Sequence, residues 1–190
     1  MEDALRLGAD AIAMAVTMGS PQQPQILASL AALVREAERA AMPVIAHAYP
    51  NGALVPAGER YSLERVAYAA RLAMELGVDI VKTFYTGSSE SFAEVVDRAA
   101  PARVVAAGGP RLETEAEALR MAYDVVQARA AGITFGRNIW QSERIGRMIR
   151  ALKLVVHSNS SVEEALDDLQ HGEPITGLSL PRSQPVRHSP

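Results

Sequence analysis

Two kinds of hydrophobic pattern alternate along the chain. Short apolar runs are bounded by glycine, proline and polar residues, and such runs predict buried strands. Between them lie longer segments in which apolar residues recur every three or four positions, as on one face of an α-helix. The expected strands span residues 9–16, 43–49, 103–109 and 132–138, with a further short strand inside 77–87. The expected helices span residues 3–7, 25–40, 62–76, 91–99, 114–130, 142–156 and 161–172.

Serine and threonine residues mark the start of several of these helices. Ser62 has the position of an N-cap, whose side-chain oxygen accepts a hydrogen bond from a backbone N–H of the first turn. A glutamate three residues after a serine or threonine predicts a capping box, in which each side chain accepts from the backbone N–H of the other residue. The expected boxes are Ser91 with Glu94, Thr114 with Glu117, and Ser161 with Glu164.

The order of the elements indicates the fold class. Strands that alternate with helices predict parallel pairing through right-handed crossovers, which fits both a doubly wound sheet and a barrel. Chemically distinctive residues stand at or near the C-terminal ends of successive expected strands: Tyr49, Lys82, Gly108, Gly109, Gly136 and Arg137. In a barrel these ends converge on one site, whereas in a doubly wound sheet they spread along an edge. The pattern therefore favours an α/β fold of the TIM (β/α)8 barrel type.

Length and composition define the domain. The 190 residues correspond to about one domain, which we place at residues 1–171. The segment 172–190 is rich in proline and serine and has too few apolar residues to pack, so we expect a mobile, disordered tail there.

Composition also argues against several classes of partner. The 19 Lys and Arg and the 22 Asp and Glu residues are interspersed, with no basic stripe that would bind nucleic acid or an anionic membrane surface. No apolar run reaches transmembrane length. The absence of cysteine excludes disulfides and permits a reducing cytoplasm, and the four scattered histidines lack metal-ligand spacing.

Lys82 is the most informative residue, because it stands in the middle of an expected buried strand. Ile80, Val81 and Phe84 give that strand the β-branched and aromatic character of a core element. Burial disfavours the ammonium form of a lysine and makes its amine available as a nucleophile toward a carbonyl. The alternative interpretation is a structural lysine near a strand end that pairs with a carboxylate.

The other candidates also have structural alternatives. Gly108-Gly109-Pro110 allows a ligand to approach the backbone and can direct N–H groups at an anion, but also suits an ordinary strand-to-helix turn. Gly136-Arg137-Asn138 adds guanidinium donors suited to phosphate, or a surface ion pair. Tyr49 is either a proton donor or a core aromatic residue. His47, two residues earlier on the same strand face, is more typical of a hydrogen-bonded histidine than of a base.

Four segments carry a resemblance to a known family. They are Tyr49-Pro50-Asn51-Gly52, the run from Asp79 to Gly87 (Asp-Ile-Val-Lys-Thr-Phe-Tyr-Thr-Gly), Ala107-Gly108-Gly109-Pro110, and Gly136-Arg137-Asn138-Ile139-Trp140-Gln141. Together they resemble the archaeal-type class I fructose-bisphosphate aldolases, over roughly residues 3–170. The same superfamily includes the aminodideoxyheptulosonate synthases and thiolases that process a phosphorylated signalling molecule.

This resemblance implies a TIM barrel, a Schiff base on Lys82 and Tyr49 as the acid/base. It implies that backbone around Gly108-Gly109 and Gly136-Arg137 binds the phosphate of a small sugar substrate. No metal or other cofactor is implied. A homo-oligomer in the cytoplasm, acting in glycolysis or gluconeogenesis, is what the resemblance leads us to expect.

The chain also departs from the family pattern. The lysine strand is the sixth of eight in the family, yet only two expected strands precede it, so we expect the C-terminal five strand–helix units of a barrel, from a truncated reading frame or a fragment. Asn51 replaces a common arginine, and His47 stands where the fructose-bisphosphate branch often has tryptophan. Arg129 takes a place where a glycine usually ends the helix.

These departures leave other functions open. One is transaldol-type synthesis of a 2-amino-3,7-dideoxy-D-threo-hept-6-ulosonate, and another is a non-catalytic protein that binds a phosphorylated ligand or serves in assembly. Five parallel strands would also leave two unpaired edges, at residues 9–16 and 132–138. We therefore expect the isolated chain to be marginally stable and to aggregate or to pair its edges with another copy.

Overall fold

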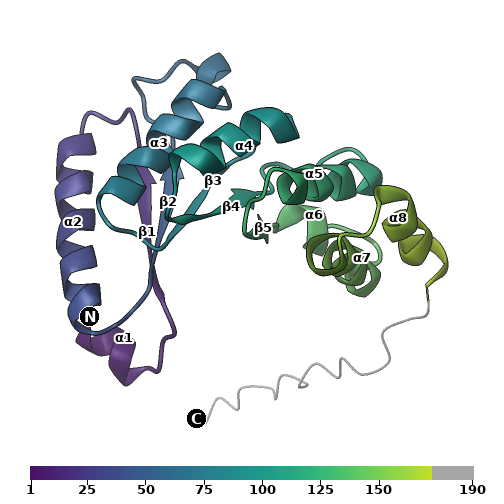
Figure 1. The fold of residues 1–190 in the computed structure, drawn as a ribbon, viewed down its shortest axis with the longest axis horizontal. Helices are drawn as coiled ribbons and strands as arrows, with labels where there is room; N and C mark the ends of the chain where they lie inside the picture. The colour runs from purple at the N-terminus through teal and green to yellow at the C-terminus, as the bar shows by residue number, and fades with distance from the viewer. Residues whose placement is uncertain (173–190) are drawn as a thin grey trace, which may run out of the picture.

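Five parallel strands form one sheet in which the order of the strands in space is their order in the chain (Figure 1). The computed structural model describes residues 1–172. The strands are β1 (Ile12–Thr17), β2 (Val44–Tyr49), β3 (Ile80–Phe84), β4 (Arg103–Ala107) and β5 (Gly132–Thr134). The helices are α1 (Glu2–Arg6), α2 (Gln23–Arg39), the 3₁₀ helix η1 (Ala57–Glu59), α3 (Leu63–Glu75), α4 (Ser89–Arg98), α5 (Glu115–Gln127), α6 (Arg137–Trp140), α7 (Ile145–Ser158) and α8 (Val162–His171). The expected alternation and the parallel pairing are confirmed.

Helices cover one face of the sheet, and within residues 1–172 no helix lies over the other face (Figure 1). Ala46 and Ala48 of β2 point to the helices and are fully buried, whereas His47 and Tyr49 point the opposite way and are only partly buried. We call this second surface the open face. Its residues on the first four strands are Ala13, Ala15 and Thr17 of β1, Ile45, His47 and Tyr49 of β2, Ile80, Lys82 and Phe84 of β3, and Arg103, Val105 and Ala107 of β4. A parallel sheet is usually covered on both faces, whereas within residues 1–172 helices cover one face of this sheet.

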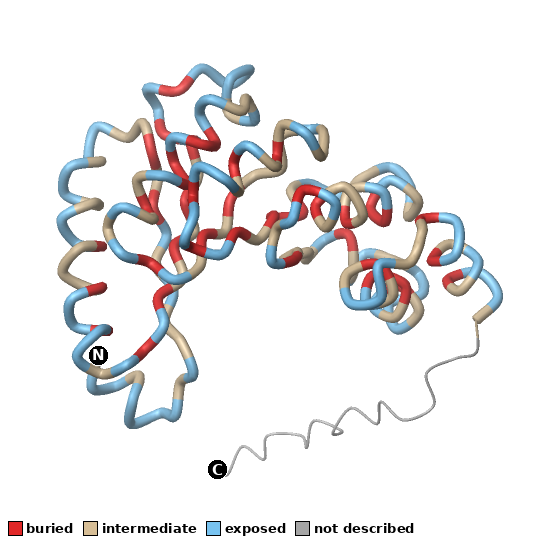
Figure 2. The backbone as a smooth tube through the Cα atoms, viewed as in Figure 1, coloured by how far each residue is buried: buried red, intermediate tan, exposed pale blue. Residues whose placement is uncertain are grey.

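The hydrophobic core has two parts, and Figure 2 shows their buried residues in red along the strands and on the inner sides of the helices. The first part lies between β1–β4 and helices α2–α4, and its largest fully buried side chains include Leu30, Val66, Val81 and Phe92. The second part lies among α5, α7 and α8, and includes Leu119, Met148 and Leu169. The second part attaches α7 and α8 to the outer side of α5, beyond the last strand.

Most of the expected helix caps are confirmed, and one is wrong. Ser62 accepts from a backbone N–H of α3, and the boxes at Thr114 and Ser161 are complete. The box at Ser91 is not formed, because α4 begins earlier, at Ser89, with Ser88 as its N-cap. The Ser88 hydroxyl oxygen accepts from the Ser91 N–H at 3.2 Å, and Glu94 pairs with Arg98 instead.

The last strand is shorter than expected. We expected a strand over residues 132–138, but β5 ends at Thr134 and Arg137–Trp140 form the short helix α6, with Gly136 as its N-cap. Within residues 1–172, β5 pairs with β4 on one side only, and the side chain of Asn138 is held by the segment that follows β4. The following helix correspondingly begins at Ile145 and not at residue 142. The expected tail at 172–190 lies, except for Gly172, outside the described residues.

Arg129 follows the end of α5 in a left-handed conformation, with φ of 62°. This conformation explains why a glycine suits the position, since glycine adopts positive φ without a steric penalty. The Arg129 side chain forms an exposed ion pair with Asp97 at 3.0 Å. Within residues 1–172, no helix has the length and apolar character needed to cross a membrane.

Candidate active site

Lys82 lies at the centre of the open face, between strands that carry other candidate residues. The register of the sheet makes His47 of β2 and Val105 of β4 the direct neighbours of Lys82. Partners in a parallel pair point to the same face of the sheet, so the side chains of His47 and Lys82 stand side by side. Two residues further along β2, Tyr49 occupies the same face at the C-terminal end of its strand.

The buried side of β3 fixes the position of Lys82. Thr83 is fully buried on the helical side, where its hydroxyl donates to the backbone carbonyl of Ala48 at 2.8 Å. The carboxylate of Asp79 accepts from the backbone N–H of Val44 at 2.8 Å just before β3 begins. These two contacts tie β3 to β2 before and after Lys82, and therefore set which β2 residue it meets.

The side chain of Lys82 is half-buried, and among residues 1–172 it has neither a carboxylate within ion-pair distance nor a hydrogen-bond partner. The alternative interpretation of Lys82 as one half of a structural ion pair is therefore not supported by this part of the chain. An unpaired, half-buried lysine in the middle of a strand on the open face is available to a ligand.

Tyr49 belongs to an aromatic stack that the sequence did not indicate. Its ring packs on Phe84 with centroids 4.5 Å apart and an interplanar angle of 27°. Phe84 in turn contacts Tyr61, which follows η1, with their ring centroids 4.8 Å apart. Burial raises the pKa of Tyr49, so its phenol remains protonated over a wide pH range. Contacts between segments this far apart in the sequence leave no periodic signal.

His47 is the second titratable neighbour of Lys82. Burial lowers the pKa of His47, and the positive charge of Lys82 lowers it further. Its ring centroid lies 6.4 Å from that of Tyr49. Neither ring nitrogen has a hydrogen-bond partner among the described residues. The sequence-based expectation of a hydrogen-bonded histidine is therefore not met within residues 1–172.

The loop after β2 is held against the loop after β1. The Gly52 N–H donates to the Met18 carbonyl at 2.9 Å, and the Leu54 N–H donates to the Gly19 carbonyl at 2.8 Å. A Cβ atom at Gly52 would overlap the backbone of Gly19 and Ser20. Only glycine permits this approach, which places the long loop that carries Tyr61 at the C-terminal edge of the sheet.

The two predicted phosphate-binding segments lie next to each other. Gly108 follows β4, and a Cβ atom there would stand 2.7 Å from the ring of Phe135; Gly109 has φ of 62°. Gly136 follows β5, and a Cβ atom there would stand 2.5 Å from the ring of Trp140. Gly108 is thus required for local packing against Phe135, whereas at Gly136 the exposed Trp140 ring could move aside.

Asn138 joins these two segments. Its side chain is buried, and its Nδ2 donates to the carbonyl oxygens of Gly108 at 2.9 Å and Pro110 at 3.4 Å. Its Oδ1 accepts from the Leu112 N–H at 2.8 Å. The adjacent Arg137 is exposed, with no hydrogen-bond or ion-pair partner in the described part of the chain. Asn138 was part of a recognised motif, but its bracing role could not be read from the sequence.

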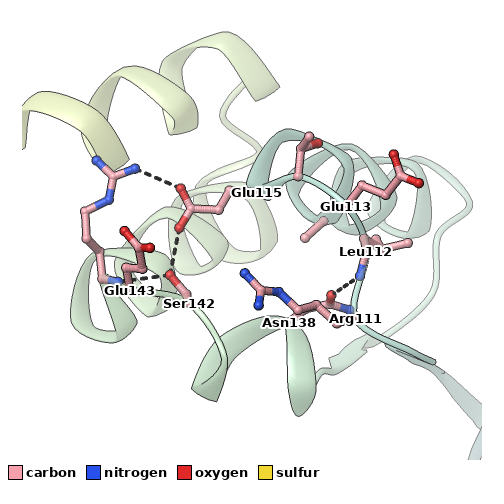
Figure 3. Close-up of a pocket in the computed structure, with 10 residues that line it drawn as sticks. Arg111, Leu112, Glu113, Glu115, Asn138, Ser142 and Glu143 are labelled. Carbon is pink, nitrogen blue, oxygen red and sulfur yellow. Dashed lines mark hydrogen bonds and ion pairs between the residues drawn. The ribbon is translucent and has the colours of Figure 1, made fainter.

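A small cavity of about 140 Å³ lies behind Asn138, between the segment after β4 and the segment after α6 (Figure 3). Glu115 is its central charge, because it accepts from the Ser142 hydroxyl at 2.7 Å and pairs with Arg144 at 2.9 Å. A wider cleft of about 740 Å³ lies between the end of β3, α5 and α8. Neither includes Lys82 or Tyr49, which lie on the open face.

A family model for DeoC/LacD family aldolases matches residues 1–142, which include the open face, the lysine strand and the segments after β4 and β5. The chain belongs to the DeoC/LacD family of aldolases. The expected family is thereby confirmed.

Two curated relatives of this family member differ in their reactions. A 2-amino-3,7-dideoxy-D-threo-hept-6-ulosonate synthase of Halobacterium salinarum is 38% identical over 166 residues, or 87% of this chain and 61% of the relative. A class 1 fructose-bisphosphate aldolase of Thermoproteus tenax is 35% identical over 167 residues, or 88% of this chain and 63% of the relative. Because the two identities are similar, they do not distinguish the substrate.

The fold is also that of a solved aldolase. An archaeal fructose-1,6-bisphosphate aldolase, with its catalytic lysine covalently bound to the carbinolamine intermediate of the substrate, matches with a TM-score of 0.78 and 36% identity. The match covers 82% of this chain and 61% of that structure. The chain thus spans about three fifths of the length of the relatives it matches. The five parallel strand–helix units correspond to that part of an aldolase barrel.

Proposed function

We propose that this protein is a class I aldolase in which Lys82 forms a Schiff base with a phosphorylated ketose. One observation carries the proposal: Lys82 is unpaired among residues 1–172 and lies between His47 and Val105 on the open face, at the centre of the sheet. A lysine with no structural partner there is suited to reaction with a carbonyl.

The proposed reaction uses the neighbours of Lys82. The amine attacks the ketone and forms an iminium, which accepts the electron pair when the C3–C4 bond breaks. Tyr49 moves protons at the reacting carbon atoms, and its raised pKa keeps the phenol in the donor form. Gly108, Gly109 and Gly136 supply backbone near the substrate phosphate, and the exposed guanidinium of Arg137 supplies charge-assisted donors.

Fructose 1,6-bisphosphate is the substrate that we propose. The aromatic stack of Tyr49, Phe84 and Tyr61, and the long loop that follows β2, give the site a defined wall beside Lys82. The similarity to fructose-bisphosphate aldolases fits this substrate but does not select it, because the heptulosonate synthase is as similar. We further expect a homo-oligomer that acts in the cytoplasm, without a metal or other cofactor.

Borohydride trapping tests the proposal. The protein is incubated with dihydroxyacetone phosphate and reduced, and a peptide that contains Lys82 should gain the mass of the reduced adduct. The Lys82→Ala variant should gain none, and Lys153→Ala, which removes an exposed lysine of α7, should label as the wild type does. Labelling at another lysine in a folded sample would overturn the assignment.

A second candidate is synthesis of an aminodideoxyheptulosonate by transaldol chemistry. The 38% identity to the Halobacterium salinarum synthase favours it. Both reactions would use Lys82 and Tyr49, so the acceptor must distinguish them. Product analysis with glyceraldehyde 3-phosphate and with aspartate semialdehyde as competing acceptors decides between the two.

A third candidate is a non-catalytic protein that binds a phosphorylated ligand. The half-buried position of Lys82 favours it, because water that reaches a site weakens the interactions made there. Aldol cleavage by the wild-type chain and by Lys82→Ala distinguishes the two interpretations. Equal background rates would support the non-catalytic protein.

A further inference from the structure

His47 is the titratable residue that stands beside Lys82 on the open face. The register pairs His47 with Lys82 on one side and with Ala15 of β1 on the other. β1 therefore contributes no charge at this level, β3 contributes Lys82, and β2 itself contributes Tyr49. Both ring nitrogens of His47 are without hydrogen-bond partners among residues 1–172, so the imidazole is free to exchange protons.

Schiff-base formation requires two proton transfers at this point. The lysine ammonium must lose a proton before its nitrogen can attack a ketone, and the resulting carbinolamine must gain one for its hydroxyl to leave as water. Tyr49 is poorly suited to the first transfer, because its raised pKa keeps it protonated. The site therefore needs a base as well as an acid.

We propose that His47 is the second proton-transfer group of this site: its imidazole takes the proton from the Lys82 ammonium and returns it to the departing carbinolamine hydroxyl. This inference rests on the proposed Schiff-base function. The step is balanced, because a ketone and the lysine ammonium become a protonated imine and one water molecule, while the imidazole ends as it began. No redox partner or cofactor is required.

The electrostatics of the pair favour this exchange. Burial and the charge of Lys82 lower the pKa of His47, so at neutral pH the imidazole is uncharged and able to accept a proton. When Lys82 gives up its proton, the charge that opposed protonation of His47 disappears. Lys82 and His47 together carry one positive charge before and after the proton transfer, so the transfer does not change the net charge of the site. His47 as base and Tyr49 as acid also have pKa values that are shifted in opposite directions.

The test follows the rate of Schiff-base formation with dihydroxyacetone phosphate by rapid mixing and borohydride quench. In His47→Gln we expect this rate to fall about 100-fold, within the usual range for loss of a proton-transfer group, with little change in the affinity for dihydroxyacetone phosphate. The wild-type rate should decrease as pH falls through the His47 pKa, below 6.5, and this part of the pH profile should be absent in His47→Gln. His157→Gln, at an exposed histidine of α7, is the control and should match the wild type.

The outcomes separate the inference from the proposed function. If the wild type forms the Lys82 adduct and His47→Gln forms it at the same rate and with the same pH profile, the inference is wrong and the function stands. If the wild type forms no adduct, the proposed function is wrong and the proton-transfer role is lost with it.

A second measurement is independent of catalysis and of the folding of any His47 variant. The ring protons of His47 are titrated by NMR in the wild type and in Lys82→Met. Loss of the Lys82 charge should raise the His47 pKa toward 6.5. An unchanged titration would show that the two side chains do not interact, and would overturn the inference.

Discussion

The Nδ2 group of Asn138 donates a hydrogen bond to the carbonyl oxygen of Gly108 across 2.9 Å. Through this contact, and through the bond from the Leu112 N–H to Oδ1, the segment after β5 positions the segment after β4. The two proposed phosphate-binding segments are therefore one braced unit, and a change at Asn138 should affect both stability and ligand binding.

We predict that Asn138→Ala lowers the free energy of unfolding by about 1–3 kcal/mol, the usual cost of leaving buried polar groups without partners. The same variant should bind a phosphorylated substrate more weakly, with KM raised more than kcat is lowered. Urea unfolding and steady-state kinetics measure the two effects. Asn51→Ala, at an exposed asparagine, should unfold like the wild type. An unchanged stability in Asn138→Ala would contradict the bracing role.

We predict that Gly52→Ala destabilises the protein by about 1–3 kcal/mol, in the range of other overpacked sites. The added methyl group would overlap the backbone of Gly19 and Ser20, which cannot rotate away as a side chain could. The matched control is Gly58→Ala in η1, where no atom lies within 4 Å of the added group. Thermal unfolding of both variants tests this, and similar melting temperatures would argue against the close contact.

The hydroxyl of Tyr85 donates to the carboxylate of Asp124 at 3.1 Å and links the end of β3 to α5. Burial, followed by the negative charge of Asp124, raises the pKa of Tyr85 above its ordinary value of 10.0. The folded state therefore holds this proton more tightly than the unfolded chain does. The raised pKa of Tyr85 therefore contributes to the free energy of unfolding. This contribution is fully present below pH 10 and decreases as the pH rises beyond it.

We predict that Tyr85→Phe weakens this alkaline loss of stability without abolishing it, because burial also raises the pKa of Tyr49. Urea unfolding at pH 7 and at about pH 10.5 provides the comparison. Tyr68→Phe, which changes a tyrosine that is 49% exposed, is the control. Its free energy of unfolding should fall between the two pH values by the same amount as that of the wild type. If Tyr85→Phe lost as much unfolding free energy as the wild type, the hydrogen bond between Tyr85 and Asp124 would not form in solution.

The edges of the sheet give a prediction about dynamics. β1 and β5 each pair on one side, whereas β2, β3 and β4 pair on both. In the isolated 190-residue chain we expect slow amide exchange in the three central strands and faster exchange in the two edge strands. Hydrogen exchange by mass spectrometry, combined with light scattering, measures this.

Self-association would alter the pattern. If copies pair their edges, protection of β1 and β5 should increase with protein concentration together with the molecular mass. Strong protection of both edge strands in a monodisperse monomer would show that the sheet closes in another way.

Much of the fold could be predicted from local signals. Alternation of apolar runs and periodic segments located the five strands of residues 1–172. Thr114 and Ser161 marked helix starts because each has its glutamate three residues later. The signal failed at α4, because Ser91 has a glutamate three residues later and yet Ser88, which has none, is the N-cap. It also failed at the end of β5, where the chain enters the short helix α6 and Asn138 makes a long-range hydrogen bond to the Gly108 carbonyl.

The candidate site was less accessible from sequence. The special position of Lys82 was visible in its own strand, but its adjacency to His47 depends on the register between β2 and β3. That register is set by buried contacts such as the one from Thr83 to the Ala48 carbonyl, which leave no pattern in the sequence. The stack of Phe84 on Tyr49 was missed for the same reason.

The arrangement of the sheet also has a consequence for synthesis on the ribosome. Because β2, β3, β4 and β5 each pair with the strand that precedes them in the chain, each of these strand–helix units finds its docking surface already made when it emerges. None of these four strands has to wait for a distant C-terminal partner to begin pairing, and the entropic cost of closing long loops stays low. The nascent chain can therefore extend its sheet one unit at a time, in the direction of translation.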